Sequence, residues 1–172
     1  MKTIPVYFPV IGIGRGKIGM LIQLIPMKKS RKKPCDGDIF VLQPFPRRFY
    51  YGKVIQTDLQ STDSFIRGMF LIYIYNYNTT EKKIVDHLEE NDLLIAPVVV
   101  NKQPWMKGFF ETIGNVEVTE TEKNVDFGFW DVLRDCYVDT AGRRLEAPPR
   151  YCSTYGLGSY GAVAKEVLHA IL

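Results

Sequence analysis

Two histidines, His87 and His169, are the first residues in this 172-residue chain that could support catalysis. An imidazole can act as a general base or a metal ligand near neutral pH. Neither histidine belongs to an HExxH or HxH pattern, so neither has a partner at a usual metal-ligand spacing. The sequence also lacks a G-x-S-x-G nucleophile motif and a P-loop. We therefore expect no enzyme and no bound metal.

The three cysteines, Cys35, Cys136 and Cys152, are widely spaced and form no CxxC pair. A zinc site or a disulfide framework would need closer and more regular spacing. The pattern favours small thiols that remain free, and free thiols are typical of a reducing compartment. We therefore expect a cytoplasmic protein.

One glycine motif could in principle bind a dinucleotide. Residues 14–19 read GRGKIG, and Asp36 and Asp38 follow about twenty residues later, where an acid that binds ribose would stand. That fold needs a buried parallel strand before the acid, whereas residues 28–34 read KKSRKKP. No alternation of strands and helices follows. The sequence predicts no cofactor.

Carboxylates gather in two acidic segments, at residues 89–92 and 117–122. The charge of the whole chain is also divided unevenly. Residues 1–33 hold eight Lys and Arg and no acid, whereas residues 34–172 hold fourteen Lys and Arg against nineteen Asp and Glu. A mildly acidic body suits a basic protein partner better than a nucleic acid. The hypothesis is that exposed acids bind the partner, and a merely solubilising face is an equal alternative. The candidate residues are Glu89, Glu90, Asp92, Glu117, Glu120 and Glu122.

The elements that position these residues are mostly short strands. Apolar runs at 38–43, 48–56 and 69–75 predict three antiparallel strands, with a bulge at Gly52. Further strands are predicted at 93–100, where Pro97 indicates an edge or a bulge, and at 109–113. A hairpin is predicted at 136–145 around Ala141 and Gly142.

Two helices complete the predicted fold. A cap at Thr79 predicts a short helix that ends at Leu88. Apolar residues recur with helical spacing at 162–171, which predicts a C-terminal helix packed on the sheet. The expected fold is α+β and strand-rich, with a curled antiparallel sheet or a small, partly open barrel, one short helix and a C-terminal helix.

The domain organisation follows from the basic segment. We expect residues 1–33 to form an N-terminal extension, basic at its end, and residues 34–172 to form a single domain. Met27 is a candidate for the true start. The apolar stretch at 4–13 is broken by Pro5 and Pro9, so it predicts neither a signal peptide nor a membrane span.

Several short blocks, taken in order, resemble the immunity protein 26 family of bacterial polymorphic toxin systems. The resemblance covers about residues 28–172, and its most specific part is the Trp-x-x-Gly segment at Trp105 and Gly108. The blocks are GDIF at 37–40, YGKV at 51–54, PVVVN at 97–101 and WMKGFFETIGN at 105–115. The resemblance implies a cytoplasmic antidote that binds and blocks a cognate protein toxin.

Most residues in these blocks are glycines or large apolar residues, and we expect them to hold the fold. The acids described above therefore remain the candidates for toxin recognition. The expected structural residues are Gly37, Asp38, Phe40, Tyr51, Gly52, Asn101, Trp105, Gly108 and Phe110.

The main alternative is a small β-barrel module that binds nucleic acid. It would use the basic residues 28–33 as an electrostatic arm and tyrosines as stacking platforms. The candidate platforms are Tyr50, Tyr51, Tyr73 and Tyr75. The acidic body makes a nucleic-acid partner the weaker prediction.

Overall fold

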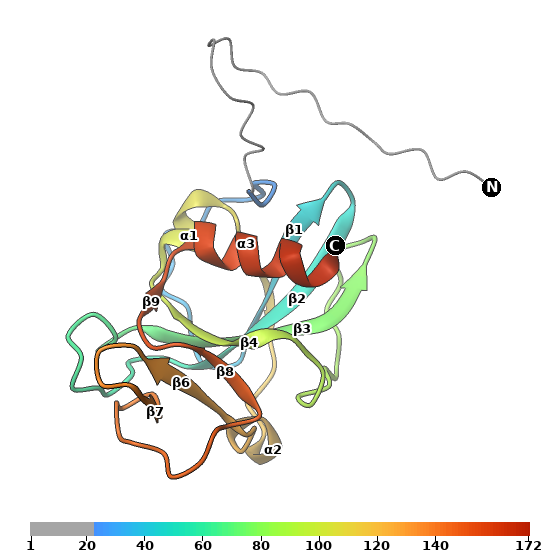
Figure 1. Ribbon diagram of the computed structural model, residues 1–172. Coiled ribbons are helices and arrows are strands. Elements are labelled where there is room, and N and C mark those ends of the chain that lie inside the picture. Colours follow the sequence, from blue (N-terminus) through green and yellow to red (C-terminus); the bar gives the residue numbers. More distant parts are fainter. Residues whose placement is uncertain (1–22) are drawn as a thin grey trace, which may run out of the picture.

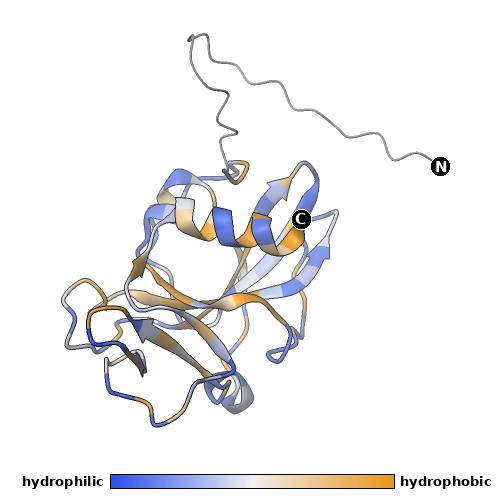
Figure 2. Ribbon diagram, viewed as in Figure 1, coloured by the Kyte–Doolittle hydropathy of each residue, from blue (hydrophilic) through white to orange (hydrophobic). Residues whose placement is uncertain are grey.

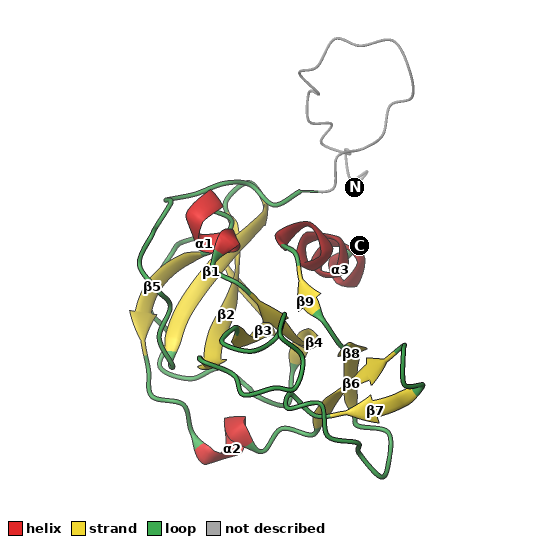
Figure 3. Cartoon of the chain, turned by 90° about the vertical axis from the view of Figure 1, so that its left-hand side faces the viewer, coloured by secondary structure: helices red, strands yellow, loops and turns green. Residues whose placement is uncertain are grey.

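The larger of two sheets contains six strands in the computed structural model, which describes residues 23–172. Its strands lie in the order β5-β1-β2-β3-β4-β9 (Figures 1 and 3). They are β1 (Asp38–Phe45), β2 (Arg48–Gln56), β3 (Phe70–Thr79), β4 (Leu93–Val100), β5 (Glu111–Asn115) and β9 (Leu157–Gly158). Neighbours are antiparallel except for β9, which pairs parallel with β4. The sheet is mixed and does not close into a barrel.

A smaller sheet has the strand order β7-β6-β8, from β6 (Phe127–Asp131), β7 (Cys136–Val138) and β8 (Tyr151–Thr154). The helices are α1 (Gln103–Lys107), α2 (Glu120–Lys123) and α3 (Tyr160–Ile171). In Figures 1 and 3, α1 and α3 lie on one side of the large sheet, and α2 and the small sheet lie on the other. The fold is therefore α+β with a C-terminal helix, as the sequence predicts.

The large sheet is buried on both faces, which explains its nearly continuous apolar strands. In β3, Phe70, Ile72 and Ile74 point into the core under α3, whereas Leu71, Tyr73 and Tyr75 point toward the small sheet. This alternation follows from the two-residue period of a strand. On α3, hydrophobic residues alternate with hydrophilic ones along the helix (Figure 2), and Val163, Ala164 and Val167 are buried against the sheet.

Gly52 is needed because Phe40 packs directly on it. The two residues are cross-strand partners, and a Cβ atom at Gly52 would lie 2.2 Å from Cζ of Phe40. The register of β2 against β3 shifts between Tyr50 and Gly52, so the predicted bulge is confirmed. Ile72 pairs with Val98 and Ile74 pairs with Ile95, which confirms a bulge next to Pro97.

The short helix predicted from Thr79 to Leu88 is wrong, because this segment contains no helix. The phenol of Tyr51 donates to the carbonyl of Lys83 at 2.7 Å and accepts from its N–H at 3.3 Å, which holds the chain as a loop. A helix of two turns has little stability of its own, so these bonds prevail. Short helices form instead at α1 and α2, and α1 ends at Gly108 with φ of 81°.

Residues 23–33 run alongside the domain. Leu24 is buried in the core under α3, and the N–H of Ile25 donates to the carbonyl of Gln43 at 2.8 Å. The boundary after residue 33 stays a prediction. The glycine motif at 14–19 lies outside the described residues. No helix between residues 23 and 172 is long and apolar enough to cross a membrane.

Candidate protein-binding site

The two acidic segments of the sequence meet at one small pocket. The loop at 85–90 forms one wall, and the connection from β5 through α2 forms the other. The pocket has a volume of about 60 Å³, and it opens to the surface. Its apolar lining residues are Ile39, Val85, Leu88 and Val116, and its polar lining residues are Lys53, Asp86, His87, Glu90, Thr119, Thr121 and Glu122.

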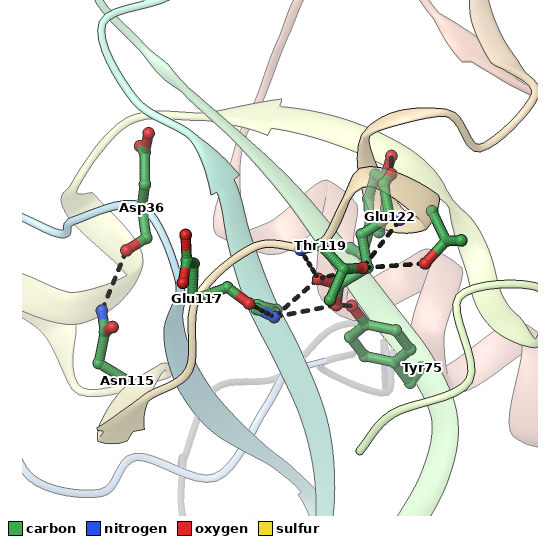
Figure 4. A network of polar contacts seen from close by, with 9 residues as sticks. Asp36, Tyr75, Asn115, Glu117, Thr119 and Glu122 are labelled. Carbon is green, nitrogen blue, oxygen red and sulfur yellow. Dashed lines mark hydrogen bonds and ion pairs between the residues drawn. The ribbon is translucent and has the colours of Figure 1, made fainter. Parts of the chain in front are cut away.

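The floor of the pocket is an ion pair between Lys53 on β2 and Glu122 on α2. Nζ of Lys53 lies 2.8 Å from Oε2 and 3.0 Å from Oε1 of Glu122. The two side chains are only 4% and 5% exposed. Nζ also donates to the carbonyl of Glu117 at 3.1 Å, so the ammonium group is satisfied without water (Figure 4).

Further hydrogen bonds fix Glu122 in place (Figure 4). The hydroxyl of Tyr75 donates to its Oε1 at 3.1 Å, and the hydroxyl of Tyr73 donates to its carbonyl at 2.8 Å. The N–H of Thr119 donates to Oε2 at 2.8 Å, and Oγ1 of Thr119 accepts from the N–H of Glu122, which completes a capping box. Helix α2 is one turn long and is held by this network.

The network sets the charges at the floor. Burial by itself would raise the pKa of Glu122, but hydrogen bonds from Lys53 and Thr119 and the charge of Lys53 outweigh it, so that pKa is lowered. Burial and the nearby Glu122 carboxylate raise the pKa of Tyr73 and Tyr75 far above the usual range. At neutral pH both phenols therefore stay protonated, and Lys53 and Glu122 neutralise each other.

The rim carries His87, Glu89 and Glu90. Nε2 of His87 lies 3.0 Å from Oε1 of Glu89, and these two side chains are 68% and 72% exposed. One ligand atom from each of the three residues lies within 4.8 Å of the others. Among residues 23–172, these three are the one cluster of His, Cys, Asp and Glu that is close enough to hold a metal ion. His87 and Glu89 are exposed, and apart from their contact with each other their side chains have no hydrogen bond between residues 23 and 172 of the kind that orients metal ligands.

The six acids predicted from the sequence fall into different environments. Glu90 and Glu122 line the pocket. Glu89 does not line it, but its carboxylate contacts His87, which does. Glu117 and Glu120 are exposed beside it. Asp92 is exposed and accepts from Nδ2 of Asn76 at 3.2 Å, and it does not line the pocket.

The exposure expected for Glu122 is wrong, because this residue is 4% exposed and paired with Lys53. The sequence contained a signal for it: Thr119-x-x-Glu122 is a capping-box pattern, which turns the Glu side chain back toward the chain. Lys53 was missed as well. Lys53 stands alone among apolar residues in the middle of β2, and a charged side chain at such a position needs a buried partner. This pattern could have identified Lys53 from the sequence.

The expected structural residues do not line the pocket. Phe40, Trp105 and Phe110 form an aromatic cluster, with ring centroids 4.5–5.3 Å apart. Asp38 accepts from Nδ2 of Asn115, and Asn101 accepts from the N–H of Gln103 ahead of α1. These contacts are all internal to the fold.

The tyrosines considered as stacking platforms are buried. Tyr50, Tyr51, Tyr73 and Tyr75 are between 0% and 5% exposed. A base can stack only on a ring whose face is open to solvent, so these four side chains cannot serve that purpose.

The comparisons with known proteins give one match. A protein-family model described as immunity protein 26 matches residues 35–135, which is more than half of the chain and includes all the residues that line the pocket. No curated protein and no solved structure matches the chain.

Proposed function

The chain belongs to the immunity protein 26 family, and from this premise we propose that it binds and neutralises a cognate bacterial protein toxin in the cytoplasm. The mechanism we infer is occlusion by a tight complex, with no chemical step. The acidic surface around the pocket supplies the contact, and the toxin presents a basic surface to it.

The observation that carries this proposal is the convergence of the two acidic segments. The loop at 85–90 and the connection that contains α2 line one pocket, although β4 and β5 separate them in the chain. Glu89, Glu117 and Glu120 are exposed around the pocket, and Glu90 is half-buried in it. Complementary charge on a partner speeds encounter and fixes the register of the complex.

The state of the cysteines supports the proposed compartment. Cys35, Cys136 and Cys152 are free, and Cys35 and Cys152 are exposed. Exposed free thiols are stable in a reducing environment such as the cytoplasm.

Coexpression tests the proposed function directly. A toxin gene located beside the gene for this chain is expressed in a sensitive bacterium, with and without the full chain. We expect growth only in cells that also make the chain, together with a complex that copurifies. A toxin that remains fully lethal would contradict the proposal.

Charge-neutralising variants then test the surface. Glu89→Gln, Glu90→Gln and Asp92→Asn are combined in one variant, and Glu117→Gln and Glu120→Gln in another. Substitutions of exposed acids change stability by only about 0.5 kcal/mol each. Glu90 is half-buried but has no hydrogen-bond partner to lose in the described part of the chain, so both variants should fold. We expect slower association with the toxin for both.

The matched control neutralises two exposed acids elsewhere, Glu146→Gln and Glu166→Gln. It should associate as fast as the parent chain. If all three variants associate equally fast, the acidic surface around the pocket is not the interface.

A further inference from the structure

We propose that the pocket between the loop at 85–90 and α2 receives one lysine or arginine side chain of the toxin. The inference rests on the proposed function, because the toxin supplies the side chain. It goes beyond that function in assigning a specific cavity and a specific chemical group to the centre of the interface.

The size and walls of the pocket fit the end of a long, cationic side chain. A volume of about 60 Å³ is far below the roughly 300–1,000 Å³ of a small-molecule site. Four apolar side chains, those of Ile39, Val85, Leu88 and Val116, line it. Lysine and arginine bury a methylene stem along apolar surface and keep the charged head near polar groups.

The charges of the pocket favour a cation. Asp86, Glu90 and Glu122 line it with Lys53 as the single permanent cation, so its charge is −2 while His87 is neutral. Lys53 and Glu122 cancel each other at the floor. The remaining charge belongs to Asp86 and Glu90, which have no hydrogen-bond or ion-pair partner in the described part of the chain.

Glu90 is the residue that gains most from such a ligand. It is half-buried, and its charge is close enough to Tyr75 to contribute to the raised pKa of that phenol. A carboxylate that is partly desolvated and unpaired is stabilised by an incoming cation more than an exposed one is. A phosphate or carboxylate ligand would be repelled from the same position.

A titration of the full chain with small side-chain analogues tests this inference without the toxin. The probes are n-butylguanidinium and n-butylammonium, and uncharged n-butylurea is the matched control. Amide chemical shifts are followed by NMR in the presence of EDTA, so that no metal ion at His87 and Glu89 contributes. We expect saturable shifts at residues 85–90 and 116–122 with the cations only, with a dissociation constant on the order of 10 mM.

Variants locate the binding. Glu90→Gln should weaken cation binding by about fivefold or more, whereas Glu120→Gln, which changes an acid outside the pocket, should weaken it by less than about twofold. Equal shifts with n-butylurea, shifts spread over the whole acidic surface, or equal effects of both substitutions would each overturn the inference.

Binding of the toxin distinguishes this inference from the proposed function. We expect Glu90→Gln to reduce toxin affinity by about tenfold and Glu120→Gln by less than about threefold, because buried charge pairs contribute more than exposed ones. If the toxin binds the parent chain and Glu90→Gln equally well, the pocket is not an anchor, and the proposed function stands. If the toxin does not bind the parent chain, both are wrong.

Discussion

Lys53 and Glu122, which are 69 residues apart in the chain, form a buried ion pair that joins β2 to α2. The pair lies under the pocket proposed as the binding site, so the position of α2 depends on it. Because both side chains are at least 95% buried, neither can be rehydrated when its partner is lost.

Lys53→Met should therefore destabilise the chain strongly. The substitution leaves the Glu122 carboxylate buried without its counter-charge, which costs about 3–5 kcal/mol in the free energy of unfolding. Urea unfolding measures the loss. The double variant Lys53→Met/Glu122→Gln removes both charges and should regain at least half of the stability. Single-variant costs that simply add in the double variant would contradict a direct interaction.

The contribution of Glu122 to the free energy of unfolding should decrease at acidic pH. Its pKa is lowered in the folded state from an ordinary value of 4.5, so its stabilisation is fully present above that value. The stabilisation is lost as the pH falls through the lowered folded pKa. We expect the stability difference between the parent chain and Glu122→Gln to be constant from about pH 7 to pH 5 and to shrink below about pH 4.5. Urea midpoints across this range test it, and a difference that does not change with pH would argue against the pair.

Trp105→Ala should cost stability and not only partner binding. The ring is 1% exposed and packs against Phe40 and Phe110, and its Nε1–H donates to Oγ1 of Thr112 at 3.1 Å. Removal of a buried tryptophan costs about 3–5 kcal/mol. Thermal unfolding measures this, and Trp130→Ala, at a partly exposed position, should cost less. Unchanged stability with lost toxin binding would make Trp105 an interface residue instead.

Leu24→Ala tests whether the segment before the predicted domain boundary contributes to the core. Leu24 is 2% exposed and lies in the core under α3. Its truncation should cost about 2–5 kcal/mol, as for other buried leucines. The neighbouring exposed residue provides the control, and Gln23→Ala should change stability by less than about 0.5 kcal/mol. Equal stability of the two variants would place the start of the domain after this segment.

Elements whose pattern is local can be predicted from the amino-acid sequence. The apolar runs in β1, β3 and β4 are buried on both faces, and the period of a strand divides their side chains between two cores. The C-terminal helix was equally predictable from its spacing. Gly52 and Pro97 indicated bulges, because glycine has no side chain to pack in a strand and proline has no N–H to donate to a neighbouring strand. The division of charge between residues 1–33 and 34–172 was also readable directly.

The polar contacts, in contrast, depend on residues that are distant in the sequence and meet only in the folded chain. The cap at Thr79 predicted a helix, but the phenol of Tyr51, brought near by β2, binds the backbone of Lys83 and keeps a loop there. Glu122 belongs to a segment that reads as exposed, yet it is buried because β2 places Lys53 beneath it. A short helix or a single carboxylate gains little from its own neighbours in sequence, so distant partners determine its state. For the same reason the pocket between the two acidic segments exists only in the folded chain.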